Sequence, residues 1–170
     1  MTRYLSISSG DLLHGLLDLQ GYTFVEKGCI IRFKEQVSTE RYHLKMEATD
    51  RQIFNSNSEI LWEELLILLN YSPETSVYVS SYEGNWQPGN LFDSDKLGEG
   101  QYVMQTNNKD VLREIFVMSL EYRAFPVFAT EDLSLAVMPT DHLDMFIAYS
   151  DSHKMSSRMI SEDLEKIEWV

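Results

Sequence analysis

Histidine and carboxylate side chains lie closest together in the stretch Asp141-His142-Leu-Asp144, with Asp151 and His153 a few residues further on. A carboxylate beside an imidazole can transfer protons, and several such groups that converge can ligate a metal. None of the four histidines forms a His-x-His or His-Glu-x-x-His spacing. The stretch is more typical of a turn in which Asp caps the backbone. We therefore expect no metal site, and Asp141, His142 and Asp144 are the candidates should the chain be an enzyme.

Motifs for nucleophilic catalysis and phosphate binding are absent from the sequence. Cys29 lies in the apolar run Gly28-Cys-Ile-Ile, where a buried and unreactive thiol is expected. The chain has no Gly-x-Ser-x-Gly elbow, no P-loop and no Gly-x-Gly-x-x-Gly stretch. We therefore predict that the protein is not an enzyme and binds no cofactor.

The segment 82–100 combines aromatic side chains with carboxylates and contains the turn dipeptides Gly-Asn and Pro-Gly. Long loops in compact domains are uncommon and often functional. Aromatic anchors rimmed by acids are typical of a surface that binds a basic protein, although Trp86 and Phe92 could instead fold into the core. The predicted partner-binding residues are Tyr82, Glu83, Trp86, Phe92, Asp93, Asp95 and Glu99.

Acidic residues are concentrated in two blocks of this chain, whose net charge is −13. Residues 51–100 carry 8 acids and 2 bases, and residues 131–170 carry 9 acids and 3 bases. Such a surface repels nucleic acid and anionic membranes and attracts basic proteins, although acidity can also serve solubility alone. We predict a secondary acidic surface at Asp141, Asp144 and Asp151.

The elements that must position these residues follow from the spacing of apolar side chains. Helical spacing predicts helices at 10–20, at 57–69 with a capping box at Ser56 and Glu59, and at 109–120 after Asn107 or Asn108. A serine followed by acids predicts a short terminal helix at 161–168. Alternating side chains predict strands at 3–8, 22–25, 30–35, 42–48, 76–82, 101–106, 126–130, 133–138 and 145–149.

This order of elements predicts one α+β domain over residues 1–170, with about three helices packed on a largely antiparallel sheet. A single cysteine allows no internal disulfide, which suits a reducing compartment. The chain shows neither the apolar region of a signal peptide nor a run long enough to span a membrane. We therefore expect a cytoplasmic protein, monomeric and without a nucleic-acid or membrane partner.

Two stretches, Ser76–Gly89 and Val127–Asp144, together with the small, acidic, single-domain character of the chain, resemble immunity proteins of bacterial polymorphic toxin systems. Contact-dependent growth inhibition is one such system. The resemblance implies a protein that binds the toxin domain of a sister cell's effector, often a basic nuclease, and blocks its active site or substrate groove. The alternatives are a small acidic adaptor or regulatory protein, a nucleic-acid-mimicking inhibitor, and an enzyme with a site near Asp141.

Overall fold

The computed structural model describes residues 2–6, 28–35, 48–81, 102–121, 123, 125–149 and 159–169. These residues form an α+β fold in which an eight-stranded sheet has the order β1-β4-β3-β5-β6-β7-β2-β8, and all seven strand pairings are antiparallel. The elements are β1 (Thr2–Ser6), β2 (Gly28–Phe33), α4 (Ala48–Leu68), β3 (Val77–Ser81), β4 (Tyr102–Thr106), α6 (Lys109–Leu120), β5 (Pro126–Ala129), β6 (Leu135–Pro139), β7 (Asp144–Tyr149) and β8 (Leu164–Trp169).

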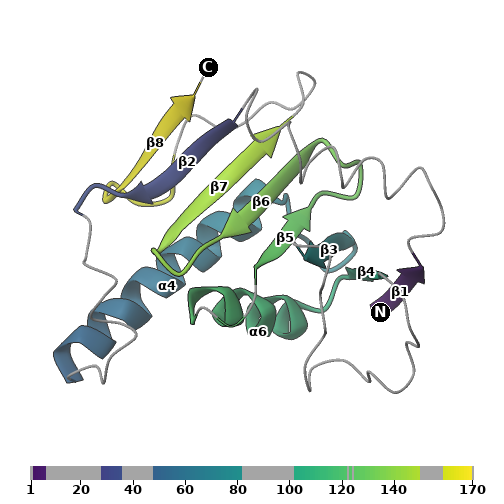
Figure 1. The fold of residues 1–170 in the computed structure, drawn as a ribbon, viewed down its shortest axis with the longest axis horizontal. Coiled ribbons are helices and arrows are strands. Elements are labelled where there is room, and N and C mark those ends of the chain that lie inside the picture. The colour runs from purple at the N-terminus through teal and green to yellow at the C-terminus, as the bar shows by residue number, and fades with distance from the viewer. Residues whose placement is uncertain are drawn as a thin grey trace.

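Both helices of the described chain cover the same face of the sheet (Figure 1). Because successive strand residues point to opposite faces, the strand registers align side chains in rows under these helices, and one row is central. The row runs across five strands and is fully or almost fully buried: Val79, Phe128, Val137, Ile147 and Cys29. The main hydrophobic core lies between this row and the two helices.

The two helices meet at an aromatic pair. The ring centroids of Trp62 on α4 and Phe116 on α6 lie 5.4 Å apart, and both side chains are buried. The guanidinium of Arg113 lies 5.5 Å from the centroid of the Trp62 ring. Tilted aromatic pairs add roughly 1 kcal/mol to the stabilisation that burial itself provides. Neither of these described helices is long and apolar enough to cross a membrane.

The ends of the helices confirm two of the predicted stop and start signals. Asn108 caps α6, since its side-chain oxygen accepts the backbone N–H groups of Asp110 at 3.0 Å and Val111 at 3.4 Å. Asn70 ends α4 in the left-handed conformation, with a φ of 48°. The N–H of Tyr71 then donates to the carbonyl of Leu66 at 2.9 Å, which completes a Schellman motif.

The start of α4 corrects the prediction. The helix begins at Ala48, so the capping box at Ser56 and Glu59 is wrong, and Ala48 does not end a strand. From residue 51 to residue 56 the side chains are mostly exposed, including Ile53 at 41% exposure. No apolar stripe marks these turns, and helical spacing therefore becomes visible only where the helix reaches the core.

The predicted terminal helix at 161–168 is also wrong, because this segment forms the edge strand β8 and pairs with β2. The hydroxyl of Ser161 accepts the N–H of Asp163 at 3.2 Å, but this local bond closes a turn before a strand. Leu164 is buried, whereas Ile167 is 38% exposed. Their spacing of three residues resembles a helical pair, yet the two side chains lie on opposite faces of the sheet.

Seven predicted strands are confirmed within shifts of a few residues, from β1 near the N-terminus to β7. The predicted helix at 10–20 and the predicted strands at 22–25 and 42–47 lie outside the described residues. The part of the chain that the structure describes therefore holds two of the three expected helices, at 48–68 and 109–120.

Candidate functional site

The predicted partner-binding loop lies outside the described residues, and so does Asp151. This applies to all seven of its predicted contacts: Tyr82, Glu83, Trp86, Phe92, Asp93, Asp95 and Glu99. Asp141 and Asp144 are described, and they lie in and after the turn between β6 and β7. The role of the loop therefore stays a prediction, and the site can be built only from the remainder of the sheet and α4.

The β6–β7 turn uses its polar side chains to hold its own shape. The hydroxyl of Thr140 donates to the carboxylate of Asp144, and the N–H of Thr140 donates to the carbonyl of Asp144 at 3.0 Å. Leu143 occupies the left-handed region with a φ of 56° and is buried. This predicted turn is confirmed, and its bonds are those of a tight hairpin connection.

Burial distinguishes the acids of this turn from surface charges. Burial raises the pKa of Asp144, while the Thr140 hydroxyl, His142 and Arg32 oppose the rise. The side chain of Asp141 is only 13% exposed, and its Oδ1 lies 3.9 Å from His142 Nε2. The two carboxylates therefore present little of the exposed acidic surface expected of them.

Neither metal binding nor a reactive thiol has support in the described ranges. No group of three or more His, Cys, Asp or Glu side chains there is arranged to hold a metal ion. Cys29 is fully buried, as predicted, and its pKa is raised to about 11, mainly by burial. A thiol with that pKa is protonated at neutral pH and is a poor nucleophile.

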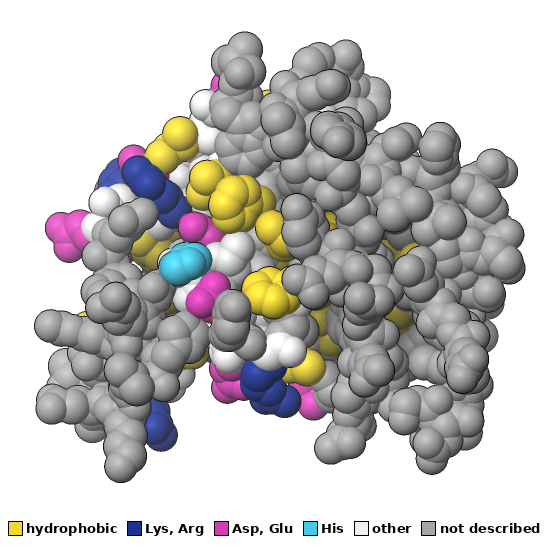
Figure 2. All heavy atoms as spheres, in the orientation of Figure 1, with side chains coloured by type: hydrophobic (Ala, Val, Ile, Leu, Met, Phe, Trp, Pro, Cys, Tyr) yellow, Lys and Arg dark blue, Asp and Glu magenta, His cyan; other side chains and the backbone are white. Residues whose placement is uncertain are grey.

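Beside this turn, a short ion-pair row crosses the sheet on the face away from the helices. The register aligns Asp144, Arg32 and Glu165 on β7, β2 and β8. Arg32 Nε donates to Glu165 Oε1 at 2.8 Å, and both side chains are about one-third exposed. Figure 2 shows acidic, basic, histidine and apolar side chains together on this face. Such a half-exposed pair contributes little to stability, but it fixes the side chains at this corner of the sheet.

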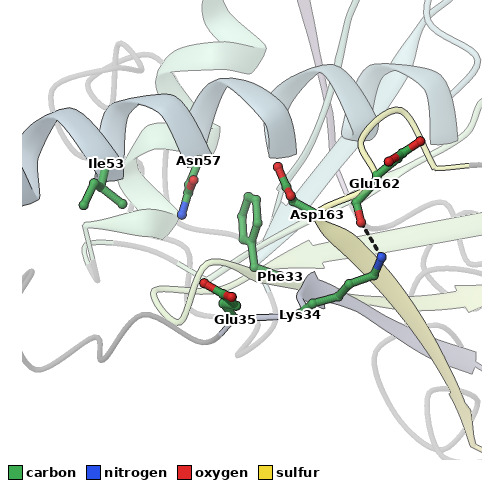
Figure 3. Close-up of a pocket in the computed structure, with 7 residues that line it drawn as sticks. All are labelled: Phe33, Lys34, Glu35, Ile53, Asn57, Glu162 and Asp163. Carbon is green, nitrogen blue, oxygen red and sulfur yellow. Dashed lines mark hydrogen bonds between the residues drawn. The ribbon is translucent and has the colours of Figure 1, made fainter.

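A pocket of about 620 Å³ opens at the same corner, between the end of β2, the early turns of α4 and the turn that leads into β8. Figure 3 shows the Phe33 ring reaching toward α4, from which Ile53 and Asn57 project. Among the residues that the structure describes, seven line the pocket: Phe33, Lys34, Glu35, Ile53, Asn57, Glu162 and Asp163. Its wall is apolar at Phe33 and Ile53, and its rim is polar.

Charge is unevenly distributed around the Phe33 ring (Figure 3). The carboxylate of Asp163 lies on one side of the ring, and Glu35 lies on the other side. The ammonium of Lys34 points away from the ring and donates to the carbonyl of Glu162. The side chain of Glu162 is also directed away. Two carboxylates therefore border the apolar wall, and the pocket lysine is bonded to the rim.

The wall formed by residues 160–163 is anchored to two elements. The N–H of Lys34 donates to the carbonyl of Asp163 at 2.8 Å, which extends the pairing of β2 with the chain before β8. The N–H of Ile160 donates at 2.9 Å to Oε2 of Glu64, a residue of α4 with 1% exposure. Burial raises the pKa of Glu64, and the bond from Ile160 opposes the rise.

Sequence reasoning missed this pocket. Lys34 and Glu162, whose contact closes its rim, lie 128 positions apart. No local pattern connects them, and the helix turn that supplies Ile53 was not expected. One signal was present, since the acids of residues 162–168 belong to the second acidic block, but their assignment to a helix hid their place beside β2.

Comparison of the chain with family models, with curated proteins and with solved structures finds no match. Its function must therefore be argued from the geometry and charge of its own residues.

Proposed function

We propose that this protein is an immunity protein that binds a basic toxin domain in the cytoplasm and neutralises it, as a monomer and without catalytic activity of its own. The observation that carries the proposal is the pocket at the β2–α4–β8 corner, where an apolar wall is bordered by the carboxylates of Glu35 and Asp163. Apolar anchoring sites with a charged border are the kind of surface on which protein partners place their most important side chains.

The charge of the chain supports the same function. A net charge of −13 attracts a basic protein over distances beyond direct contact, and this attraction increases the rate of association. An inhibitor must capture a toxin before the toxin acts, so a fast association rate has a direct purpose. The second acidic block lies next to the pocket because it contains the turn before β8. We therefore give this block a contact role in addition to its long-range field.

The loop at 82–100 is the second part of the proposed interface. Its aromatic and acidic composition, with Trp86, Asp93 and Asp95, is complementary to a basic partner. The loop and the pocket make separable contributions that substitutions can distinguish. Replacement of Trp86 by Ala, or of Asp93 and Asp95 together by Asn, is expected to weaken binding by over ~1 kcal/mol while the fold stays intact.

The experiment is co-expression, in a bacterial host, of this chain with the C-terminal domain of a large protein encoded directly upstream of it. We expect growth arrest by that domain alone and normal growth when this chain is co-expressed at an equal level of the domain. Growth arrest that persists with both proteins present would contradict the proposal, and so would a harmless upstream product. An adaptor would bind the domain without restoring growth.

A further inference from the structure

The pocket beside β8 has the size of a ligand site and contains two kinds of surface. Its volume of about 620 Å³ lies within the range of roughly 300–1,000 Å³ typical of pockets that bind small molecules or single anchoring side chains. Ile53, which is 41% exposed, supplies most of the apolar contact, and Phe33, which is 7% exposed, supplies a smaller part. An occupant must match these apolar contacts and the carboxylates that border them.

Charge excludes two classes of occupant. An anion would face Glu35 and Asp163 on either side of the Phe33 ring, while Lys34 points away to the Glu162 carbonyl. A wholly apolar group would cover exposed carboxylates without replacing their bonds to water, which costs free energy. A cation on an apolar stem satisfies both parts of the wall.

Among natural cations, the guanidinium group fits this arrangement better than an ammonium. Arginine places three methylene groups and a planar cation in one side chain, and the guanidinium carries five N–H donors that can reach several acceptors at once. The carboxylates of Asp163 and Glu35 and the amide oxygen of Asn57 are acceptors for these donors, whereas Phe33, which is 7% exposed and belongs to the main core, offers only a small apolar contact. Lysine carries its donors on one compact ammonium and cannot spread them over separate acceptors in the same way.

We propose that this pocket binds an arginine side chain of a partner protein, with the stem against Phe33 and Ile53 and the guanidinium at Glu35, Asp163 and Asn57. The identity of the partner as a toxin domain rests on the proposed function, but the recognition of arginine does not. An arginine buried at the centre of an interface often dominates its affinity, so a single partner residue would define the specificity of this corner.

The experiment titrates the full-length protein with N-acetyl-arginine-N-methylamide while backbone amide NMR shifts are recorded. The matched probes are the citrulline analogue, which has the same shape without charge, and the lysine analogue. We expect saturable shifts at Phe33, Asn57 and Asp163 with the arginine probe, and a dissociation constant at least about five-fold weaker with either matched probe. Equal affinity for the citrulline probe, or shifts spread over all acidic residues, would overturn the inference.

Two variants test which carboxylates bind the arginine probe. The double change Glu35→Gln and Asp163→Asn should weaken arginine binding about five-fold or more. The control combines Glu74→Gln with Glu131→Gln in the β5–β6 turn, two exposed residues that do not line the pocket, and it removes the same charge. The control should retain the affinity of the unaltered protein within about two-fold. An equal loss in both variants would show a general effect of charge and would reject the pocket.

The outcomes separate this inference from the proposed function. Growth rescue without preferential binding of the arginine probe would reject the arginine pocket and leave the immunity function. Preferential binding without growth rescue would leave the pocket and reject the immunity function. Titration of the unaltered protein with the arginine, citrulline and lysine probes tests the arginine pocket even if a variant fails to fold.

Discussion

At the scale of single residues, Glu64 connects the pocket wall to the helix that faces it. The carboxylate has 1% exposure, and Oε2 accepts the N–H of Ile160 at 2.9 Å. Burial raises the pKa of Glu64 above its ordinary value. Ionised carboxylates are costly to bury, whereas the bond to Ile160 needs only an acceptor oxygen. The acceptor, and not the negative charge, is therefore the stabilising feature of this side chain.

The change Glu64→Gln should leave the free energy of unfolding equal or slightly larger at about pH 7, since the amide oxygen can still accept from Ile160. A raised folded-state pKa means that the folded protein binds a proton more readily than the unfolded chain. Stability therefore rises as pH falls from the folded pKa toward the unfolded pKa, and it is lost as pH rises through that window. Urea unfolding at about pH 7 and about pH 5 measures this difference.

The Glu64→Gln variant should gain less stability on acidification than the unaltered protein does. The pKa of Asp144 is also raised, so Asp144 adds the same change of stability with pH to both proteins. The exposed neighbour Glu63, replaced by Gln, is the control for a change of charge on α4. A Glu64→Gln protein that is markedly less stable at about pH 7 would show that the charge itself holds the wall.

At the scale of elements, β8 is the part of the fold most important for the site, because it follows the turn that closes the pocket. The strand lies at the edge of the sheet and pairs with β2 from Gly28 to Phe33. Removal of the chain after Ser157 would therefore remove a paired strand in addition to four acids and two bases. Such a truncation should destabilise the fold, whereas a helix on the surface could have been removed with less effect.

Two single substitutions on β8 test this position more sharply than a truncation. Replacement of Leu164, which is buried in the main core, by Ala should lower the free energy of unfolding by about 2–5 kcal/mol. Ile167 lies on the opposite face of the same strand and is 38% exposed, so its replacement by Ala should lower the free energy of unfolding by less than about 1 kcal/mol. Equal and small losses in urea unfolding would indicate that β8 does not pack as the structure shows.

The cap of α6 gives a second prediction at this scale. Replacement of Asn108 by Ala removes the acceptor for the N–H groups of Asp110 and Val111, and should cost about 1 kcal/mol of stability. Asn108→Asp keeps an acceptor oxygen and is the control, with an expected loss of only a few tenths of a kcal/mol. Thermal unfolding followed by circular dichroism gives both values. A loss in the Asp variant as large as in the Ala variant would contradict the capping role.

These elements show which features the sequence could predict. Asn108 and the helix end at Asn70 were found because a cap or a stop depends on residues adjacent along the chain. The start of α4 was missed because its early turns face outward and follow no apolar period. Strand β8 was missed because a serine with following acids closes a turn before a strand as well as it caps a helix.

At the scale of the whole molecule, the sheet brings distant parts of the chain together. Strand β1 forms one edge and β8 forms the other, although they belong to opposite ends of the chain. The pocket combines residues 33–35 and 162–163 with Ile53 and Asn57. The pairing of β2 with β8 makes the first two segments neighbours, and α4 supplies the other two residues. A pocket assembled from such distant residues cannot be predicted from local patterns, whereas the surplus of acid is visible in composition alone.

The rate of association is the property that this charge should control. Charges at the border of an interface mainly change the association rate, whereas pairs enclosed in it change the dissociation rate. The change of Glu35 to Gln with Asp163 to Asn should therefore accelerate dissociation of the toxin complex, while the control at Glu74 and Glu131 should chiefly slow association. Equal dissociation rates for the two variants would place the pocket outside the interface.

The most direct measurement of the central claim is the association rate constant of this protein with the purified toxin domain, recorded as ionic strength rises from about 0.01 M to about 0.15 M. The Debye length falls over that range from about 30 Å to about 8 Å, so attraction between an acidic inhibitor and a basic toxin should be strongly screened. We predict a decrease of about ten-fold or more in the association rate constant. A rate constant that does not change with salt would contradict capture of a basic partner by this acidic surface.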